Sequence, residues 1–260
     1  MGGLESETML HPLDSFTAFT LRKNEVIYNQ SPLTLPLPSW AWWGVTDDLT
    51  VEIDLLPLVG GLFTEPFLPV PSVDVRYKLR DGTGGWDPWV AYETMFQYLY
   101  VEHNQASNEV LFAKRRGGSW FHRLNSSFKI GESTYVHASA GFTYTHSLVL
   151  ENSKNSGSRA EYRDRVFPDF SLGLDLRMKR WASTHLTLSY GSTFVYLDNV
   201  PTKLQIAYGF RFAPFLERPS PFLKTMRIEL AALHIAFPQI EAEMSLPFPL
   251  LPYFYWQWMW

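Results

Sequence analysis

The 260-residue chain contains no cysteine, which excludes disulfide frameworks, thiolate metal sites and cysteine nucleophiles. Charge is also scarce: charged residues make up 18% of the chain, and the formal net charge is −4. This balance lacks the basic excess that typically marks nucleic-acid-binding domains, so no nucleic-acid partner is expected. The chain has no charge-free apolar run of the ~18 residues that a membrane-spanning helix needs. Its first five residues have neither the basic nor the apolar region of a signal peptide.

Aromatic residues and helix breakers are abundant instead. Aromatics make up 16% of the chain and include ten Trp, while 18 Pro and 16 Gly interrupt it too often for long helices. Two classes fit this composition. One is a large soluble β-sandwich, and the other is a transmembrane β-barrel, whose apolar face is hidden by averaging along the sequence.

Long runs of alternating polarity favour the barrel. Residues 135–148 alternate for fourteen positions, with an apolar set from Val136 to Leu148 and a polar set from His137 to Ser147. Similar alternation recurs at 169–179, 185–196, 203–212 and 226–232. Soluble strands are usually five to six residues long, whereas spanning strands need about 9–11. We therefore predict an all-β, transmembrane antiparallel β-barrel.

The spacing of the alternating segments predicts about twelve strands, with ten or fourteen as alternatives. The expected strands are 15–22, 39–46, 49–56, 72–80, 88–101, 118–130, 132–148, 168–179, 184–197, 202–213, 223–235 and 239–246. Tight turns are expected at 46–48, 131 and 180–183, and longer connections at 23–38, 57–71, 102–117 and 149–167. This alternation of short and long connections is typical of outer-membrane barrels, whose periplasmic turns are short.

Two local features resemble bacterial outer-membrane β-barrel proteins of the porin-like kind. The segment 40–50, WAWWGVTDDLT, is similar to their Gly–hydrophobic–Thr–Asp–x–Leu hairpin, and the chain ends on an aromatic residue, Trp260. Trp and Tyr also gather near the expected strand ends, as in interfacial girdles. The resemblance names no specific family. It implies an integral protein of the Gram-negative outer membrane, with the lipid bilayer as its first partner.

The polar parity of the strands is assigned to the lumen. It carries nine acidic residues: Glu52, Asp54, Asp74, Glu93, Asp169, Asp175, Glu229, Glu241 and Glu243. It also carries ten basic residues: Arg76, Lys78, Arg80, Arg123, Lys129, Arg177, Lys179, Lys203, Arg211 and Arg227. This near balance suits either a hydrated pore or an interior cross-linked by ion pairs. A twelve-strand bore lies between filled eight-strand barrels and open porins.

The C-terminal segment is unusual. We expect a lead-in at 1–14, a barrel over 15–246 and a Pro- and aromatic-rich tail over 247–260. Such a tail must lie in lipid, close the barrel or dock on another envelope protein. We favour an anchor, because three Pro within six residues are a poor lead-in to a strand. The expected contact residues are Tyr253, Phe254, Trp256, Trp258 and Trp260.

Enzymatic and metal-binding signatures are missing from the sequence. The His-x-Ser-Asn motif of outer-membrane phospholipases is absent, as are HExxH, P-loop, dinucleotide-binding and calcium-loop patterns. The seven His are dispersed, so we expect no metal, no cofactor and no enzyme. Two functions remain. One is a porin-like channel or transporter for small polar solutes, and the other is a non-conducting barrel that anchors or plugs a larger envelope complex.

Overall fold

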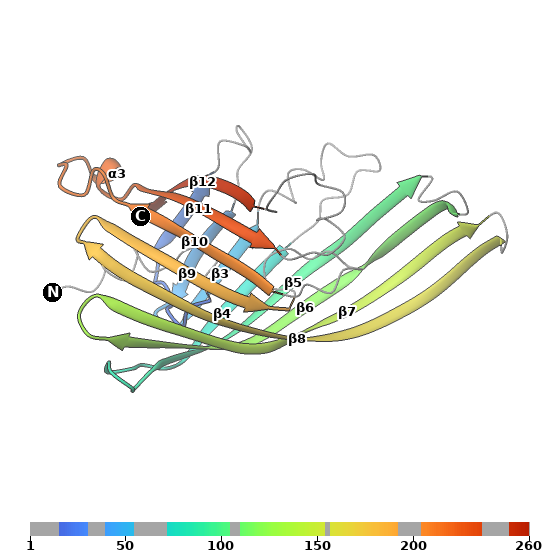
Figure 1. Cartoon of the computed structure of the whole chain (residues 1–260), viewed down its shortest axis with the longest axis horizontal. Coiled ribbons are helices and arrows are strands. Elements are labelled where there is room, and N and C mark those ends of the chain that lie inside the picture. The colour runs from blue at the N-terminus through green and yellow to red at the C-terminus, as the bar shows by residue number, and fades with distance from the viewer. Residues whose placement is uncertain are drawn as a thin grey trace.

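The computed structural model describes residues 16–30, 40–54, 72–104, 110–153, 157–191, 204–235 and 250–259. These residues form twelve antiparallel strands in a closed barrel, in which each strand pairs with its neighbours in sequence and β1 pairs with β12 (Figure 1). The predicted fold class and strand number are therefore confirmed. The only helix in the described part of the chain is α3 (Pro221–Lys224), and no described helix is long and apolar enough to cross a membrane.

The strands differ greatly in length. Eight of them have five to ten residues: β1 (Val26–Gln30), β2 (Trp40–Thr46), β3 (Leu49–Asp54), β4 (Ser72–Arg80), β9 (Ala182–Tyr190), β10 (Leu204–Phe212), β11 (Arg227–Ile235) and β12 (Leu250–Met259). The other four have 16 to 23 residues: β5 (Trp89–Asn104), β6 (Val110–Ile130), β7 (Thr134–Ser153) and β8 (Gly157–Lys179). These four run well beyond the rest at one end of the barrel (Figure 1).

The tight turns lie at the opposite end (Figure 1). The ladder pairs Thr46 with Leu49, Ile130 with Thr134, and Lys179 with Ala182 bracket the three turns expected from the sequence. Gly131 has a φ of 80°, a backbone conformation that residues with a side chain rarely adopt. Its position in the β6–β7 turn explains why a glycine is needed there.

The long connections expected at 102–117 and 149–167 are wrong, because strands β5 to β8 continue through most of both ranges. Two predicted strand assignments are also wrong. Residues 16–22 are not a strand but an irregular segment with buried side chains, and the first strand is β1, inside the region expected to be a loop. The apolar residues of segment 16–22 are buried inside the barrel and do not face lipid. The C-terminal tail is the second case: β12 pairs with both β11 and β1, so it closes the barrel and is not an anchor added to a closed one.

The prolines of the tail do not prevent this closure. Pro247 and Pro249 precede the strand, and Pro252 is in register with Ala232 near the start of β12. The predicted strand 239–246 lies outside the described residues.

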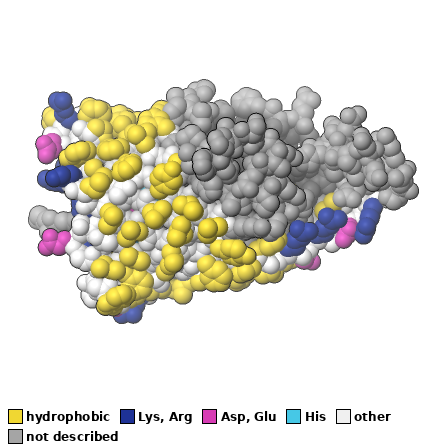
Figure 2. Space-filling view, in the orientation of Figure 1, with side chains coloured by type: hydrophobic (Ala, Val, Ile, Leu, Met, Phe, Trp, Pro, Cys, Tyr) yellow, Lys and Arg dark blue, Asp and Glu magenta, His cyan; other side chains and the backbone are white. Residues whose placement is uncertain are grey.

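The outer surface of the barrel is apolar. Leu172, Leu188, Leu230 and Phe210 each expose 40% or more of their surface, and hydrophobic side chains cover the face seen in Figure 2. The interior is polar: Ser127, Thr143, Thr145 and other alternate residues are fully buried. A barrel that is apolar outside and polar inside satisfies its backbone internally and buries its outer face in lipid. The chain therefore has the architecture of an integral outer-membrane β-barrel.

Candidate functional site

The barrel interior holds most of the charges that the sequence assigned to it. The buried members of the predicted set are Asp74, Glu93, Arg123, Asp169, Asp175, Arg211, Arg227 and Glu229, and the half-buried ones are Glu52, Arg76, Lys78, Lys129 and Arg177. The assignment is wrong for Arg80 and Lys179, which lie at strand ends and are exposed. Asp54 occupies the last position of β3, and its side chain lies outside the described residues, as do Lys203, Glu241 and Glu243. Burying so many charges is costly unless they are paired, and the contacts below show how they pair.

One row of lumenal side chains crosses β4 to β8 at a single level. The ladder places Arg76 beside Glu93, and Glu93 beside Arg123. Arg76 Nη2 lies 3.1 Å from Glu93 Oε2, and Arg123 Nη1 lies 3.7 Å from Glu93 Oε1. Arg123 Nε donates to Asp169 Oδ1 at 3.0 Å, although β7 separates their strands. The row therefore links four strands through two arginines and two carboxylates.

A glycine on β7 makes the contact between Arg123 and Asp169 possible. Gly141 sits between them in the ladder. A Cβ on Gly141 would lie 2.9 Å from Arg123 Cγ and 2.0 Å from the His122 carbonyl oxygen. Any side chain at this position would therefore collide with the backbone and with the arginine as it reaches across β7.

A second charged group lies on the opposite side of the bore. Arg211 Nε on β10 donates to Glu229 Oε2 on β11 at 2.8 Å, and His185 Nε2 on β9 lies 3.5 Å from Glu229 Oε1. The side chains of Arg211 and Glu229 are each 1% exposed. This pair is more deeply buried than the surface pairs of the long strands, so removing one of its partners should destabilise the fold far more than breaking a surface pair.

Three further polar residues form a hydrogen-bonded chain near the tight-turn end. Ser127 Oγ lies 2.8 Å from His137 Nδ1, and His137 Nε2 lies 3.0 Å from Asp175 Oδ2. All three are buried. Ser127 also accepts the backbone N–H of Ala18 at 2.8 Å, so this hydroxyl is already engaged by the N-terminal segment.

That N-terminal segment, residues 16–22, lies inside the barrel, and we call it the plug. Phe16, Thr17, Ala18, Phe19 and Leu21 are all buried. The plug is held by wall side chains and forms no ladder with a strand. Its contacts include Leu21 N to Thr50 Oγ1 at 2.8 Å, and Arg76 Nη1 to the Phe19 carbonyl at 3.2 Å.

Aromatic side chains of the barrel wall also hold the plug. The Phe19 ring packs on Trp89 and Tyr135, with centroid distances of 5.6 and 5.7 Å. The Arg123 guanidinium lies 4.0 Å from the centroid of the Phe16 ring, a cation–π geometry. The plug thus contacts the same arginines that organise the charged row.

The β2–β3 hairpin contacts the chain at the point where it leaves the plug and continues to β1. The Thr20 hydroxyl donates to the Asp47 carbonyl at 2.9 Å, and Lys23 N donates to Asp47 Oδ1 at 2.9 Å. A Cβ on Gly44 would lie 1.9 Å from the Arg22 carbonyl oxygen, so only glycine lets the backbone pass. The hairpin that resembles outer-membrane barrels therefore has a specific role here, because its Gly and Asp hold the chain next to the plug.

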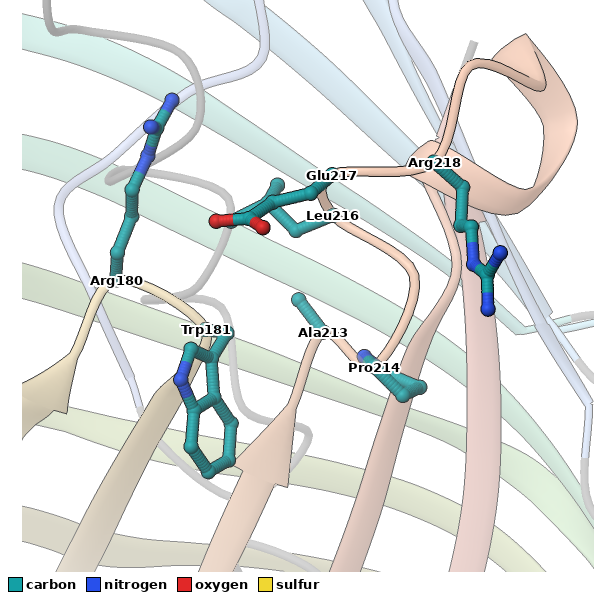
Figure 3. A pocket seen from close by; sticks show the side chains of 7 residues that line it. All are labelled: Arg180, Trp181, Ala213, Pro214, Leu216, Glu217 and Arg218. Atoms are coloured by element: carbon teal, nitrogen blue, oxygen red, sulfur yellow. The ribbon is translucent and has the colours of Figure 1, made fainter.

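A pocket of about 640 Å³ lies at the tight-turn end, between the β8–β9 turn and the segment after β10 (Figure 3). Trp181 forms part of its wall, and the Glu217 carboxylate projects toward the side on which Arg180 lies. Arg218 points away from Arg180 (Figure 3). Ala213 N donates to the Trp181 carbonyl at 2.7 Å, which fixes the two segments relative to one another.

The aromatic residues divide between the two faces. Trp43 and Trp181 are about half exposed on the outer surface, as a girdle requires. Trp42 and Trp89 also lie near predicted strand ends but are lumenal: Trp42 Nε1 donates to Glu52, and Trp89 packs on the plug. Successive residues of a strand point to opposite faces, so an aromatic residue near a strand end can face either lipid or the lumen. Nearness to a strand end does not show which face it takes.

The tail residues lie on the outer side of the closing strand where they are described. Trp258 stacks on Phe222 of α3 and on Tyr28 of β1, with centroid distances of 5.4 and 6.2 Å. Trp256 packs against Phe254 and Trp258. The side chain of Tyr253 and all of Trp260 lie outside the described residues.

Sequence reasoning did not identify the plug. It also did not identify Ser127 and His137, which contact the plug, or Gly44, beside which the backbone of Arg22 passes. The plug has the same mixture of apolar and hydroxyl residues as a strand, so its composition gave no signal. Among the residues whose placement is described, no group of three or more His, Asp or Glu is positioned to hold a metal ion.

Comparisons with known proteins give only distant structural similarities. No family model matches the chain, and no curated protein matches it. One solved structure, titled "CymD monoaromatic hydrocarbon channel", has a TM-score of 0.34 and 7% identity, covering 92% of this chain and 89% of that one. The Pseudomonas putida toluene transporter TodX gives TM-scores of 0.33 and 0.30 in two structures, with 10% and 8% identity. These cover 91% of this chain and 85% and 86% of the TodX chains.

Proposed function

We propose that the protein is a channel for small polar solutes in the bacterial outer membrane, closed at rest by its own plug. The observation that carries this proposal is the way the plug is held. The backbone N–H groups of Ala18 and Leu21 donate to the side chains of Ser127 and Thr50, and the plug adds no strand to the barrel. A segment held in this way can leave without breaking any strand pair.

The wall behind the plug supports the same proposal. Displacing the plug would uncover hydroxyl groups, the Arg76 and Arg123 guanidinium groups and the His137 ring, all of which bind water and polar solutes well. An interior built only for packing would be apolar, because buried polar groups do not stabilise a fold more than apolar ones.

The alternative is a non-conducting barrel that anchors or plugs an envelope complex. The buried pairs of Arg123 with Asp169 and of Arg211 with Glu229 favour it, because they cross-link the interior. The two functions predict different conductance once the plug is removed.

The experiment is a planar-bilayer recording of the full chain and of a chain lacking residues 1–22. We expect rare, small openings for the full chain and a stable open level for the truncated one. A gentler variant, Ser127→Ala with Thr50→Val, removes two acceptors of the plug and should raise the open probability several-fold. The matched control, Ser139→Ala with Thr187→Val, alters two buried lumenal hydroxyls at other sites and should behave as the full chain. Folded barrels that stay silent in all variants would support the alternative.

A further inference from the structure

We propose that the lipid-facing surface of β7 and β8, just beyond the apolar band, binds the phosphorylated sugar headgroup of a glycolipid in the surrounding bilayer. The site is formed by Tyr144, His146, Tyr162 and Asp164, which we call the outer cluster. All four belong to the strand parity that faces lipid. The inference concerns the outside of the barrel, so it does not depend on whether the lumen conducts.

The outer cluster lies at the level of the lipid headgroups. The lipid-facing positions of β8 are all apolar from Val166 to Met178, and Asp164 is the first charge beyond them. That apolar run covers about 40 Å of strand at about 3.3 Å per residue, or roughly 28 Å across the membrane at a tilt of about 45°. The apolar band of an outer-membrane barrel is about 25 Å tall. Asp164 therefore comes where the hydrocarbon ends and the headgroups begin.

One carboxylate organises the outer cluster. Asp164 Oδ1 accepts the Tyr144 hydroxyl at 3.1 Å and lies 2.6 Å from His146 Nδ1. Because a carboxylate only accepts hydrogen bonds, Nδ1 carries the proton of this pair, and Nε2 of a neutral ring is left as an acceptor. Both contacts end on Oδ1, and the Asp164 side chain is 58% exposed, so the carboxylate can also accept hydroxyl groups of a ligand.

Exposed ring faces border this carboxylate. Tyr162 is 68% exposed, and its ring stacks on His146 with a centroid distance of 5.6 Å. On the β6 side, Trp120 stacks on Tyr144 at 5.8 Å. The Trp120 ring extends over Gly118, the ladder partner of His146, since a Cβ on Gly118 would lie 2.9 Å from Trp120 Cη2. The apolar C–H face of a sugar ring can pack on this aromatic surface while its hydroxyl groups reach the carboxylate.

The carboxylate distinguishes the outer cluster from an ordinary interfacial girdle. Trp and Tyr are expected at this level in any outer-membrane barrel, because their rings suit the headgroup zone. A lipid-facing Asp is not expected there, since its charge repels phosphate and is unfavourable near hydrocarbon. Asp164 therefore disfavours a headgroup that is only a phosphate and favours one that offers hydroxyl groups.

An arginine at the same level provides a partner for phosphate. Arg116 of β6, Leu148 and Tyr162 lie in one row of the ladder, and Arg116 is exposed. Two strand spacings of about 4.8 Å each separate Arg116 from Tyr162. A guanidinium binds phosphate through paired N–H groups. The surface therefore fits a headgroup that carries its phosphate about one sugar ring away from the sugar that stacks on Tyr162.

The test is native mass spectrometry of the full chain, released from detergent micelles after incubation with lipid A, a phosphorylated diglucosamine lipid. Phosphatidylglycerol and phosphatidylethanolamine serve as the comparison lipids. We expect lipid A to bind at concentrations about tenfold lower than either phospholipid requires. Asp164→Asn with Tyr162→Leu should abolish this preference. Arg116→Gln should weaken the binding of lipid A several-fold and leave the binding of dephosphorylated lipid A unchanged.

The matched controls remove the same groups elsewhere on the surface. Tyr190→Leu removes a lipid-facing tyrosine of β9 that is 50% exposed, and Glu132→Gln removes an exposed carboxylate in the β6–β7 turn. Both should keep the preference for lipid A, and each variant is checked for the heat-modifiable band of a folded barrel. Asp164→Asn alone keeps the size of the side chain and should lower the preference several-fold, so it replaces the double variant if that variant does not fold.

Three results would overturn the inference. One is equal binding of the three lipids, and another is a preference for lipid A that survives the substitutions at Asp164 and Tyr162. The third is a preference for phosphatidylethanolamine, which would show that the outer cluster binds an ammonium group and not a sugar. None of these results bears on the proposed channel, because the measurement does not involve conductance.

Discussion

The barrel has a tall wall, β5–β8, and a short wall, β9–β12 with β1–β4. The short strands have at most ten residues, about what is needed to cross a bilayer, whereas β8 has 23. The additional length of the tall wall cannot serve to span the membrane. This extension carries partly exposed charges such as Arg159 and Glu161, whereas Arg211 and Glu229 of the short wall form a deeply buried pair.

The ion pairs of the two walls therefore differ in how deeply they are buried. Arg211 and Glu229 form a deeply buried ion pair within the short wall, in which Arg211 Nε donates to Glu229 Oε2 at 2.8 Å. Arg159 and Arg163 both lie within ion-pair distance of the Glu161 carboxylate, and the Arg159 side chain is 69% exposed. The plug contacts the tall wall toward its tight-turn end, at Ser127, His137 and Arg123.

The largest expected difference between the walls follows from deleting residues. Removal of 250–260 takes away β12 and leaves one edge of β11 and one edge of β1 unpaired in lipid, where each unsatisfied backbone group costs several kcal/mol. We expect no folded, heat-modifiable band on gels. Replacement of 150–160, also eleven residues, by Asn-Gly shortens the tall wall and should leave the folded band intact. Equal loss in both variants would show that the tall wall is part of the folding core.

The sequence predicted the barrel and its lumenal parity because alternation is a local property of each strand. It did not predict which segment closes the barrel. Closure depends on which strand lies beside β1, and Pro252 made the true partner look unsuitable. It also missed the plug, because apolar residues that are buried inside a barrel look the same in sequence as apolar residues that face lipid. Gly44 carries the one available signal, because a glycine in a strand often marks close approach of another backbone.

The next difference concerns ion pairs in the two walls. Arg211→Met leaves Glu229 buried without its main partner, which should lower the free energy of unfolding by about 3–5 kcal/mol. Arg159→Met breaks a pair whose side chains are 69% and 35% exposed, and should cost about 0–1 kcal/mol. Urea unfolding in detergent or lipid vesicles measures both. The double variant Arg211→Met with Glu229→Leu should recover much of the loss, and failure to recover would mean that packing, not charge, dominates this site.

Positions on the outer face of one strand offer a smaller contrast. Leu172 lies among the exposed apolar residues of β8, and Tyr162 on the same parity lies ten residues away in the extension. Leu172→Arg should destabilise the barrel by about 2–4 kcal/mol if position 172 is at the bilayer midplane. Tyr162→Arg should have an effect within about 1 kcal/mol, since an interfacial or exposed position tolerates charge. Similar losses at both positions would place the extension inside the membrane and remove the basis of the comparison.

The smallest effect is expected where the two walls meet, in the turn 81–88 between β4 and β5. Here Asp87 Oδ2 accepts from the Thr83 hydroxyl at 2.8 Å and from the Thr83 N–H at 3.0 Å, while Oδ1 pairs with Arg80. These donors, led by the Thr83 hydroxyl, lower the pKa of Asp87 below its usual value. A carboxyl whose pKa is lowered by folding stabilises the fold above its unfolded pKa, about 3.9, and loses this contribution as the pH falls through the folded value. Asp87→Asn should therefore be slightly less stable than the parent at pH 7, with the difference vanishing once the pH lies below the lowered pKa of folded Asp87. Thr83→Val keeps the backbone N–H and should show a smaller version of the same pH dependence. A difference that does not change with pH would mean that the turn acts through its shape and not through this charge.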